Sequence, residues 1–290
     1  MFSKKALQRV NSKGRGFTAY LVYVADSFRE SIGNIKQRKS VAAAIIIFST
    51  GAQALVLLSL LPLFLNSDLS AWLSLALGTL FWTAVIAGWL LLHLSLIRDL
   101  SGAPIGLKLA NQLTIFRFLL IPPILFLIGH DRLIAAMVLY VICICTDVVD
   151  GMAARMRQEI TVFGVVMDPL ADIFSTAGVF AILLWQGLLP AWVFLLLMVR
   201  YSILLAGTVI IFFKYGPLEF KATPVGKIVG VLQAFAVIMI VTYTVLGGDA
   251  GPVLGRYLYP LLGLLFSAVI VSQLMLGIRM IKSRTVQIGS

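Results

Sequence analysis

Long apolar runs dominate this chain and constrain what it can fold into. Hydrophobic residues make up 60% of its 290 residues and charged residues 12%, whereas soluble domains carry about 25% charged residues. A helix that crosses a bilayer needs about 20 predominantly apolar residues. No run alternates as a barrel strand does, so we expect an all-α integral membrane protein. The sequence predicts eight spans, near residues 41–65, 70–97, 112–128, 133–154, 168–187, 190–213, 227–246 and 257–281.

The distribution of basic residues predicts the orientation in the membrane. The loops on one side carry only Arg132 and Arg256, and the other side carries the remaining Lys and Arg clusters. Because cytoplasmic segments are enriched in Lys and Arg, we expect both termini in the cytoplasm. The net charge of +11 follows this membrane face, so we expect no nucleic-acid partner. The basic clusters lie in residues 1–40, the loops near 98–111, 151–165 and 214–227, and the C-terminal tail.

Three parts are predicted along the chain. Residues 1–40 form a basic cytoplasmic segment whose apolar residues recur at helical spacing, which favours an amphipathic helix at the membrane surface or a solvated tail. Residues 41–100 are expected to form an accessory hairpin of two spans. Neither span contains an acidic side chain, since Asp68 and Asp99 lie outside them. Residues 105–285 are expected to form a six-helix catalytic bundle.

Four aspartates lie in the segment DVVDGMAARMRQEITVFGVVMDPLAD, which runs from residue 147 to residue 172. Asp147 and Asp150 are three residues apart, and Asp168 and Asp172 are four apart, so each pair projects from one face of a helix. The short polar stretch between the pairs turns the chain back, which brings the two faces together. Carboxylates near hydrocarbon are costly unless they are paired, hydrated or metal-bound, so the cluster predicts a reaction centre.

The composition of this segment predicts a metal site. Clustered carboxylates do not all stay ionised unless cations neutralise them, and oxygen ligands suit Mg²⁺, Mn²⁺ or Ca²⁺. Gly151, Ala154 and Gly164 leave room for a diphosphate, and Arg155 offers a contact to a phosphate. A polar cluster that only locks helices together is the structural alternative.

The pattern D-x2-D-G-x2-A-R-x8-G-x3-D-x3-D resembles the signature of the CDP-alcohol phosphotransferase family. The resemblance implies that Asp147, Asp150 and Asp168 bind the metals, Mg²⁺ or Mn²⁺ and as two ions, with Asp172 completing the metal site and acting as general base. It also implies a homodimer. In LANQLTIFR, which resembles the entry to the first core helix, Asn111, Thr114 and Arg117 are expected near the nucleotide; the alternative for the first two is helix capping.

The resemblance implies transfer of a phosphatidyl group from CDP-diacylglycerol to an alcohol with release of CMP. The stretch FKATPVGKIVGVLQ more loosely resembles phosphatidylglycerolphosphate synthases. Arg200, Lys221 and Lys227 are therefore candidates for binding the acceptor, and glycerol 3-phosphate is the leading acceptor. Phosphatidylglycerol, an inositol phosphate and serine stay open, and Arg200 has the structural alternative of pairing with Asp168 or Asp172. Intramembrane carboxylates also occur in cation and proton transporters, which is the alternative from another class.

Overall fold

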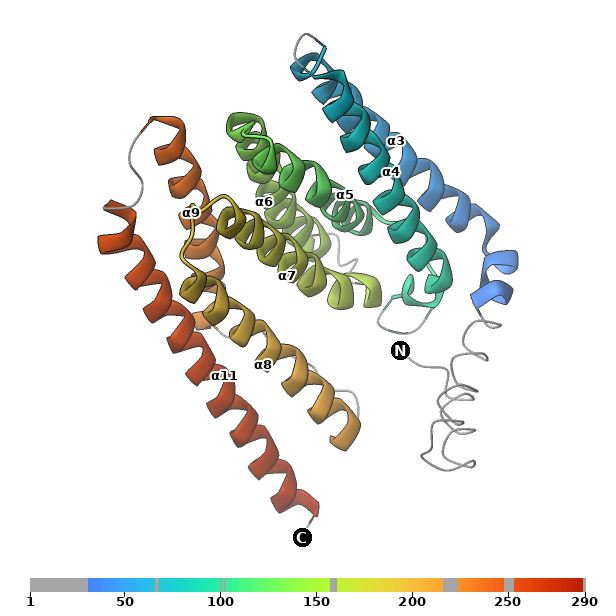
Figure 1. The fold of residues 1–290 in the computed structure, drawn as a ribbon. Coiled ribbons are helices and arrows are strands. Elements are labelled where there is room, and N and C mark those ends of the chain that lie inside the picture. The colour runs from blue at the N-terminus through green and yellow to red at the C-terminus, as the bar shows by residue number, and fades with distance from the viewer. Residues whose placement is uncertain are drawn as a thin grey trace, which may run out of the picture. The chain divides into compact units, whose positions relative to one another are not determined.

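The computed structural model describes residues 31–65, 68–99, 101, 103–156, 161–215, 224–247 and 253–288. The predicted surface helix of residues 1–40 therefore lies largely outside the described residues. Most of the described residues lie in long helices (Figure 1). They are α3 (Lys39–Leu60), α4 (Leu69–Leu92), α5 (Leu109–Gly129), α6 (Leu133–Met156), α7 (Val162–Trp185), α8 (Ala191–Tyr215), α9 (Pro224–Val245) and α11 (Tyr259–Ile288), with short turns η1 (Leu61–Leu63), η2 (Leu94–Leu96) and η3 (Leu254–Leu258).

The all-α membrane architecture expected from the sequence is confirmed. Each predicted span corresponds to one long helix. Among the described residues, six helices are long and apolar enough to cross a membrane. The other two, α6 and α8, contain shorter apolar stretches at Leu133–Val149 and Ala191–Gly207. Helix α7 begins at Val162, six residues before the predicted start, so that Asp168 lies within the helix rather than at its beginning.

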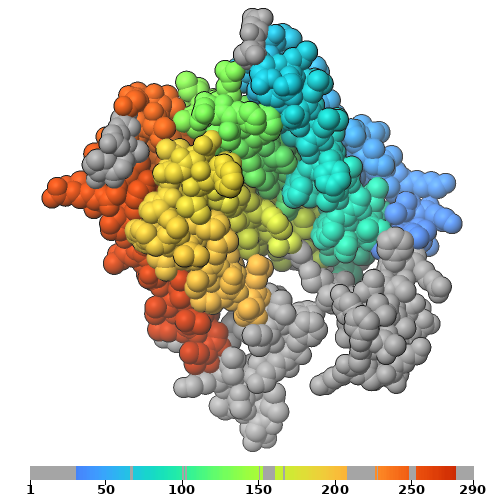
Figure 2. All heavy atoms as spheres, in the orientation of Figure 1, coloured from blue at the N-terminus to red at the C-terminus, as the bar shows by residue number. Residues whose placement is uncertain are grey.

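The described chain separates into two compact units, and the first unit contains the aspartate segment. It comprises residues 1–126 and 140–172. Helices α3 and α4 lie side by side as a hairpin (Figures 1 and 2). Large apolar side chains on the outer surface of the hairpin are exposed, such as Ile47, Leu77 and Phe81 at 70%, 70% and 72%. Such a surface suits contact with lipid.

The inner surface of the hairpin belongs to the same hydrophobic core as α5 and α7. Ile86 and Leu90 of α4 are buried together with Ile115 of α5 and Phe163 and Met167 of α7. The linker that leads into α5 also contacts the start of α7, because the Val162 N–H donates to the Arg98 carbonyl at 3.0 Å. Arg38 donates to the carbonyls of Leu94 and Ile105 and so fastens the same linker. The division into an accessory hairpin and a catalytic bundle remains a prediction.

The second unit comprises residues 127–139 and 173–290. Helix α11 packs along α8 and also contacts α9. At the contact with α8, a Cβ added to Gly263 would lie 2.6 Å from the Trp192 ring, so only glycine fits there without a shift of the ring. Phe180 and Phe266 contribute buried aromatic rings with centroids 6.2 Å apart. Close helix packing of this kind is typical of membrane bundles.

Candidate active site

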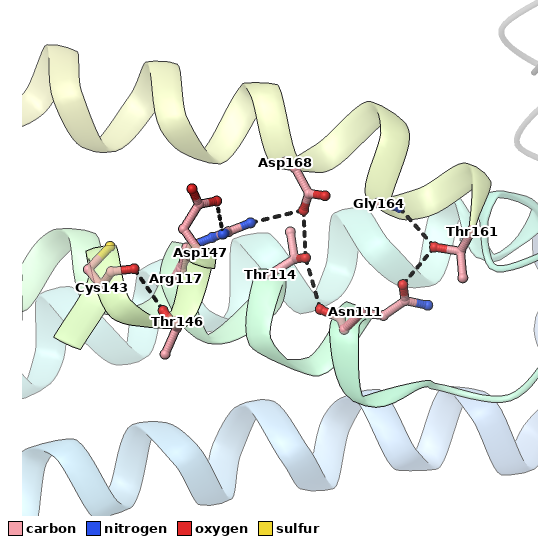
Figure 3. A network of polar contacts seen from close by, with 10 residues as sticks. Asn111, Thr114, Arg117, Cys143, Thr146, Asp147, Thr161, Gly164 and Asp168 are labelled. Carbon is pink, nitrogen blue, oxygen red and sulfur yellow. Dashed lines mark hydrogen bonds and ion pairs between the residues drawn. The ribbon is translucent and has the colours of Figure 1, made fainter. Parts of the chain in front are cut away.

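Arg117 joins two of the four aspartates. Its side chain extends from α5, and its Nη1 and Nη2 groups donate to Asp147 Oδ1 of α6 and Asp168 Oδ1 of α7, the second at 2.9 Å (Figure 3). The side chain of Arg117 is only 5% exposed, whereas those of Asp147 and Asp168 are 59% and 42% exposed. The guanidinium thus lies beneath two carboxylates that remain accessible. A planar guanidinium suits this bridging role better than an ammonium does.

Thr114 strengthens the hold on Asp168. Its hydroxyl donates to Asp168 Oδ1 at 2.7 Å, so the oxygen that binds Arg117 also accepts this second hydrogen bond. Thr114 is buried and lies one turn before Arg117 on α5. Thr114 therefore contacts an aspartate from another helix, which goes beyond local helix capping. The arrangement leaves Asp168 Oδ2 without a hydrogen bond from the described residues, and this oxygen remains available to a ligand.

A second network fixes the start of α7 against the start of α5. The Gly164 N–H donates to Thr161 Oγ1 at 3.0 Å, and the Thr161 hydroxyl donates to Asn111 Oδ1 at 2.7 Å (Figure 3). Thr161 acts as the N-cap of α7, since its side chain binds an N–H of the first turn. Asn111 is fully buried, and its Nδ2 group has no hydrogen-bond partner among the described residues. A buried amide donor without a partner is uncommon in a folded protein, which makes Asn111 a candidate for contact with a ligand.

Gly164 provides space beside Asp168. A Cβ at Gly164 would lie 3.3 Å from Asp168 Oδ2 and 3.4 Å from Thr161 Oγ1. We expect Gly164→Ala to reduce the proposed turnover by roughly 3- to 10-fold, because the carboxylate would have to move away from the position set by Arg117 and Thr114. Steady-state CMP release checks this value.

Gly78→Ala in α4 is the matched control, because a Cβ there meets nothing within 4 Å. Alanine is the better helix former, so the control should keep its activity and its thermal stability. Unchanged turnover in Gly164→Ala would contradict a need for this space.

The other predicted site residues are placed as follows. Asp172 is exposed and lies one turn beyond Asp168 on α7. Asp150, Gly151, Ala154 and Arg155 belong to the last turns of α6. The side chains of Asp150, Ala154 and Arg155 lie outside the described residues, as do Lys221 and the side chain of Lys227. The structure therefore brings Asn111, Thr114, Arg117, Asp147, Gly164 and Asp168 together.

Arg200 lies on α8 in the second unit and is buried. Its Nη1 donates to Gln233 Oε1 of α9 at 2.6 Å, and its guanidinium carbon lies 5.2 Å and 5.9 Å from the centroids of the Tyr201 and Phe266 rings. Its Nε has no hydrogen-bond partner among the described residues. An amide and two aromatic rings thus surround the charge, and no described salt bridge joins it to an acid.

The carboxylates suit a divalent cation in their chemistry. Asp147 and Asp168 come from two helices, present oxygen ligands and are accessible, and Asp168 keeps one oxygen that accepts no hydrogen bond from the described residues. Hard cations such as Mg²⁺ prefer such ligands. In the described part of the chain, no three acidic, histidine or cysteine side chains converge on one point. Arg117 supplies the positive charge between the two carboxylates.

Sequence and structure thus define an all-α membrane protein. Its candidate site combines an arginine of α5 with carboxylates of α6 and α7. Residues 107–281 match the CDP-alcohol phosphatidyltransferase family. This match covers more than half of the chain, and the chain belongs to that family of transferases. The resemblance seen in the aspartate pattern is confirmed.

Three bacterial relatives show similarity over shorter stretches. A CDP-diacylglycerol–glycerol-3-phosphate 3-phosphatidyltransferase of Bacillus subtilis (strain 168) is 30% identical over 35% of this chain and 63% of the relative. One of the same name in Treponema pallidum (strain Nichols) is 33% identical over 25% and 34%. A probable phosphatidylglycerophosphate synthase of Mycobacterium tuberculosis (strain ATCC 25618 / H37Rv) is 35% identical over 32% and 47%. The chain thus spans between about a third and two thirds of each relative.

Proposed function

We propose that this protein synthesises phospholipid by transferring a phosphatidyl group from CDP-diacylglycerol to glycerol 3-phosphate, with release of CMP. The observation that carries the proposal is the bridge from Arg117 to Asp147 and Asp168, inside the segment that matches the family. The site combines accessible carboxylates with a buried cation and a buried amide donor. These groups suit the binding of a diphosphate and the removal of a hydroxyl proton.

The residues of the candidate site divide the tasks of the proposed reaction among them. Asp172 accepts the proton of the acceptor hydroxyl, whose oxygen attacks the phosphorus that carries the diacylglycerol. The bond from that phosphorus to the CMP oxygen breaks, and CMP leaves. Asn111 and Arg155 bind the nucleotide diphosphate, while Thr114 and Arg117 hold Asp168 in place. Gly151, Ala154 and Gly164 leave room for the phosphates.

Asp147, Asp150, Asp168 and Asp172 would hold two Mg²⁺ or Mn²⁺ ions. Bound there, the metal would neutralise the diphosphate and the developing charge on the leaving group. The oxygen donors of Asp147 and Asp168 support this assignment. Removal of divalent ions by a chelator should abolish turnover.

Glycerol 3-phosphate is the proposed acceptor for two reasons. The names of the relatives from Bacillus subtilis and Treponema pallidum specify this acceptor. In addition, Arg200 offers a buried guanidinium whose partner is an amide, and we propose that Arg200, Lys221 and Lys227 bind the acceptor phosphate. A charged group in a membrane helix commonly marks a substrate pathway.

We also propose that both termini and the active site face the cytoplasm and that the enzyme forms a homodimer. The site residues lie in the first turns of α5 and α7 and the last turns of α6, so the site is near one end of these helices. That position suits a soluble nucleotide in water and acyl chains in lipid. Cysteine labelling of loops from each side of the membrane tests the orientation.

The deciding experiment is an assay of the purified full-length chain. CDP-diacylglycerol and Mg²⁺ or Mn²⁺ are supplied with glycerol 3-phosphate, serine, an inositol phosphate or glycerol, and CMP and lipid products are measured. Metal-dependent CMP release with glycerol 3-phosphate supports the proposal. Release only with another acceptor would change the substrate, and no release with any acceptor would reject the phosphatidyl transfer.

Replacing Arg200 tests the acceptor site. We expect Arg200→Ala to lower kcat/KM for glycerol 3-phosphate by roughly 10- to 100-fold, because a charge-assisted hydrogen bond contributes about 1.5 to 3 kcal/mol. Binding of CDP-diacylglycerol should change little. The comparison acceptor is glycerol at high concentration, which has no phosphate.

Gln233→Leu is the matched control, since it removes the described partner of Arg200 and keeps the guanidinium. If Arg200 only joins α8 to α9, both variants should lose activity equally with glycerol and glycerol 3-phosphate. Such equal losses would contradict the acceptor role.

A further inference from the structure

Helix α5 contains a proline pair directly after the arginine that joins the two aspartates. Pro122 and Pro123 lie inside the helix, which continues from Leu109 to Gly129. Proline has no backbone N–H, so Pro122 does not supply the regular helical hydrogen bond to the carbonyl four residues earlier. That carbonyl belongs to Phe118, the residue next to Arg117. The regular backbone bonding of α5 is therefore interrupted at the edge of the candidate active site.

A side chain of the N-terminal hairpin supplies the missing donor. The indole Nε1 of Trp82, on α4, donates to the Phe118 carbonyl at 2.8 Å. Phe118 is only 3% exposed, and in a membrane interior no water replaces a lost backbone partner. A donor from a neighbouring helix is one way in which membrane proteins satisfy a carbonyl freed by proline. Trp82 thus supplies the donor that Pro122 lacks, from outside the segment that matches the family.

The packing around this bond extends toward the site. Ile86 and Leu90, one and two turns beyond Trp82 on α4, belong to the core that includes Ile115 and Phe118 of α5. Phe163, Met167 and Ala171 of α7 share that core, and Asp168 follows Met167 directly. The hairpin therefore contacts the helices that carry both Arg117 and Asp168.

We infer that Trp82 is a positioning residue for the reaction. By binding the Phe118 carbonyl it fixes the turn of α5 that directs Arg117 toward Asp147 and Asp168. The hairpin of α3 and α4 then contributes to catalysis by positioning Arg117. This inference rests on the proposed function, because it assigns Trp82 an effect on phosphatidyl transfer that acts through Arg117.

The test is a double-substitution cycle. Trp82→Phe removes the indole donor, whereas Pro122→Ala restores a backbone N–H that can bind the Phe118 carbonyl within α5. The control is Trp72→Phe, since Trp72 Nε1 also donates from α4 to a backbone carbonyl, that of Leu57 in α3, at 3.4 Å. The Leu57 carbonyl already accepts the Leu61 N–H, so this indole bond is dispensable.

We expect Trp82→Phe to lower kcat/KM for CDP-diacylglycerol about tenfold per folded enzyme, as the loss of a buried hydrogen bond would. Trp72→Phe should stay within about twofold of the parent. In the Pro122→Ala background, Trp82→Phe should cost less than about twofold, because the carbonyl has its own helical donor. A purely structural role predicts reduced thermal stability with unchanged turnover per folded enzyme.

Two results would overturn the inference: equal turnover of Trp82→Phe and Trp72→Phe, or the same loss in both proline backgrounds. If a phenylalanine variant does not fold, Trp82 is replaced by its benzothienyl analogue, which keeps the ring shape and lacks the N–H. If the parent releases no CMP, the proposed function fails by itself. The thermal midpoints of the same four chains then still report whether Trp82 and Pro122 are coupled, and additive midpoints would reject the hydrogen-bond role.

Discussion

Arg117→Gln is expected to reduce CMP release by roughly 100-fold or more, the scale of loss when a preorganised charge is removed from an active site. The buried guanidinium contacts both Asp147 and Asp168, so its loss leaves two facing carboxylates without their shared counter-charge. Because the carboxylates of Asp147 and Asp168 are 59% and 42% exposed, water screens part of their repulsion, and the cost in folding stability is smaller than for a fully buried ion pair. We also expect a lower thermal midpoint, and Mg²⁺ should raise that midpoint more in the variant than in the parent.

Two comparison variants separate the loss of the charge from the loss of the planar guanidinium and from a general effect of removing an arginine. Arg117→Lys keeps the charge and loses the planar fork, so its activity should be intermediate. Arg256→Gln removes an exposed arginine that contacts the Tyr257 ring and should have no effect. Adding Asp147→Asn to Arg117→Gln should restore stability without restoring turnover. Near-parental activity of Arg117→Gln would contradict the role of the bridge.

Asp172→Asn is expected to lower kcat by about 10²- to 10⁴-fold, the usual contribution of a general base. Asparagine keeps the size of the side chain and accepts no proton at the relevant pH. Binding of CDP-diacylglycerol and metal should stay largely intact, because the base acts on the acceptor hydroxyl. Asp150→Asn, in contrast, should weaken nucleotide binding itself. Titrations with the CDP-lipid, alongside single-turnover rates, measure the two effects separately.

Asp131→Asn is the control for this pair. Asp131 lies in the loop between α5 and α6 with φ of 56°, a conformation that asparagine adopts readily. Turnover and binding should both be unchanged. The division of tasks is wrong if Asp172→Asn and Asp150→Asn lose nucleotide affinity equally, or if Asp172→Asn turns over at the parental rate.

The helices were predictable because hydrophobic length is a local property. Each apolar run became one helix, and the largest difference at a helix start is that of α7. That helix starts early because Thr161 caps it and Asn111, fifty residues before, holds the cap. A threonine three residues before Gly164 is a local capping signal, whereas its bond to Asn111 depends on how two helices meet. The sequence pattern does not contain that information.

In the candidate site, too, the local spacing of residues was predictable from the sequence, whereas the contacts between helices were not. The aspartate spacing indicated that the chain turns back between Asp147 and Asp168, and the structure places both against Arg117. The family resemblance placed Arg117 near the nucleotide, but the identity of its partners depends on the packing of α5, α6 and α7. Trp82 carried no signal of its own, since a tryptophan in an apolar run is usually a packing or interface residue. Its proposed role became visible only from its hydrogen bond to the Phe118 carbonyl beside the proline pair.

The arginine bridge also has a consequence for biogenesis. The ribosome makes α5 before α6 and α7, so Arg117 leaves the ribosome ahead of both of its aspartate partners. An arginine about 12 Å along a helix makes insertion of that helix costly until its charge is neutralised. The hairpin, by contrast, is made first, so Trp82 is already present when the proline-containing turn arrives. The order of synthesis thus matches the order in which α5 needs its partners, with the backbone donor early and the carboxylates late.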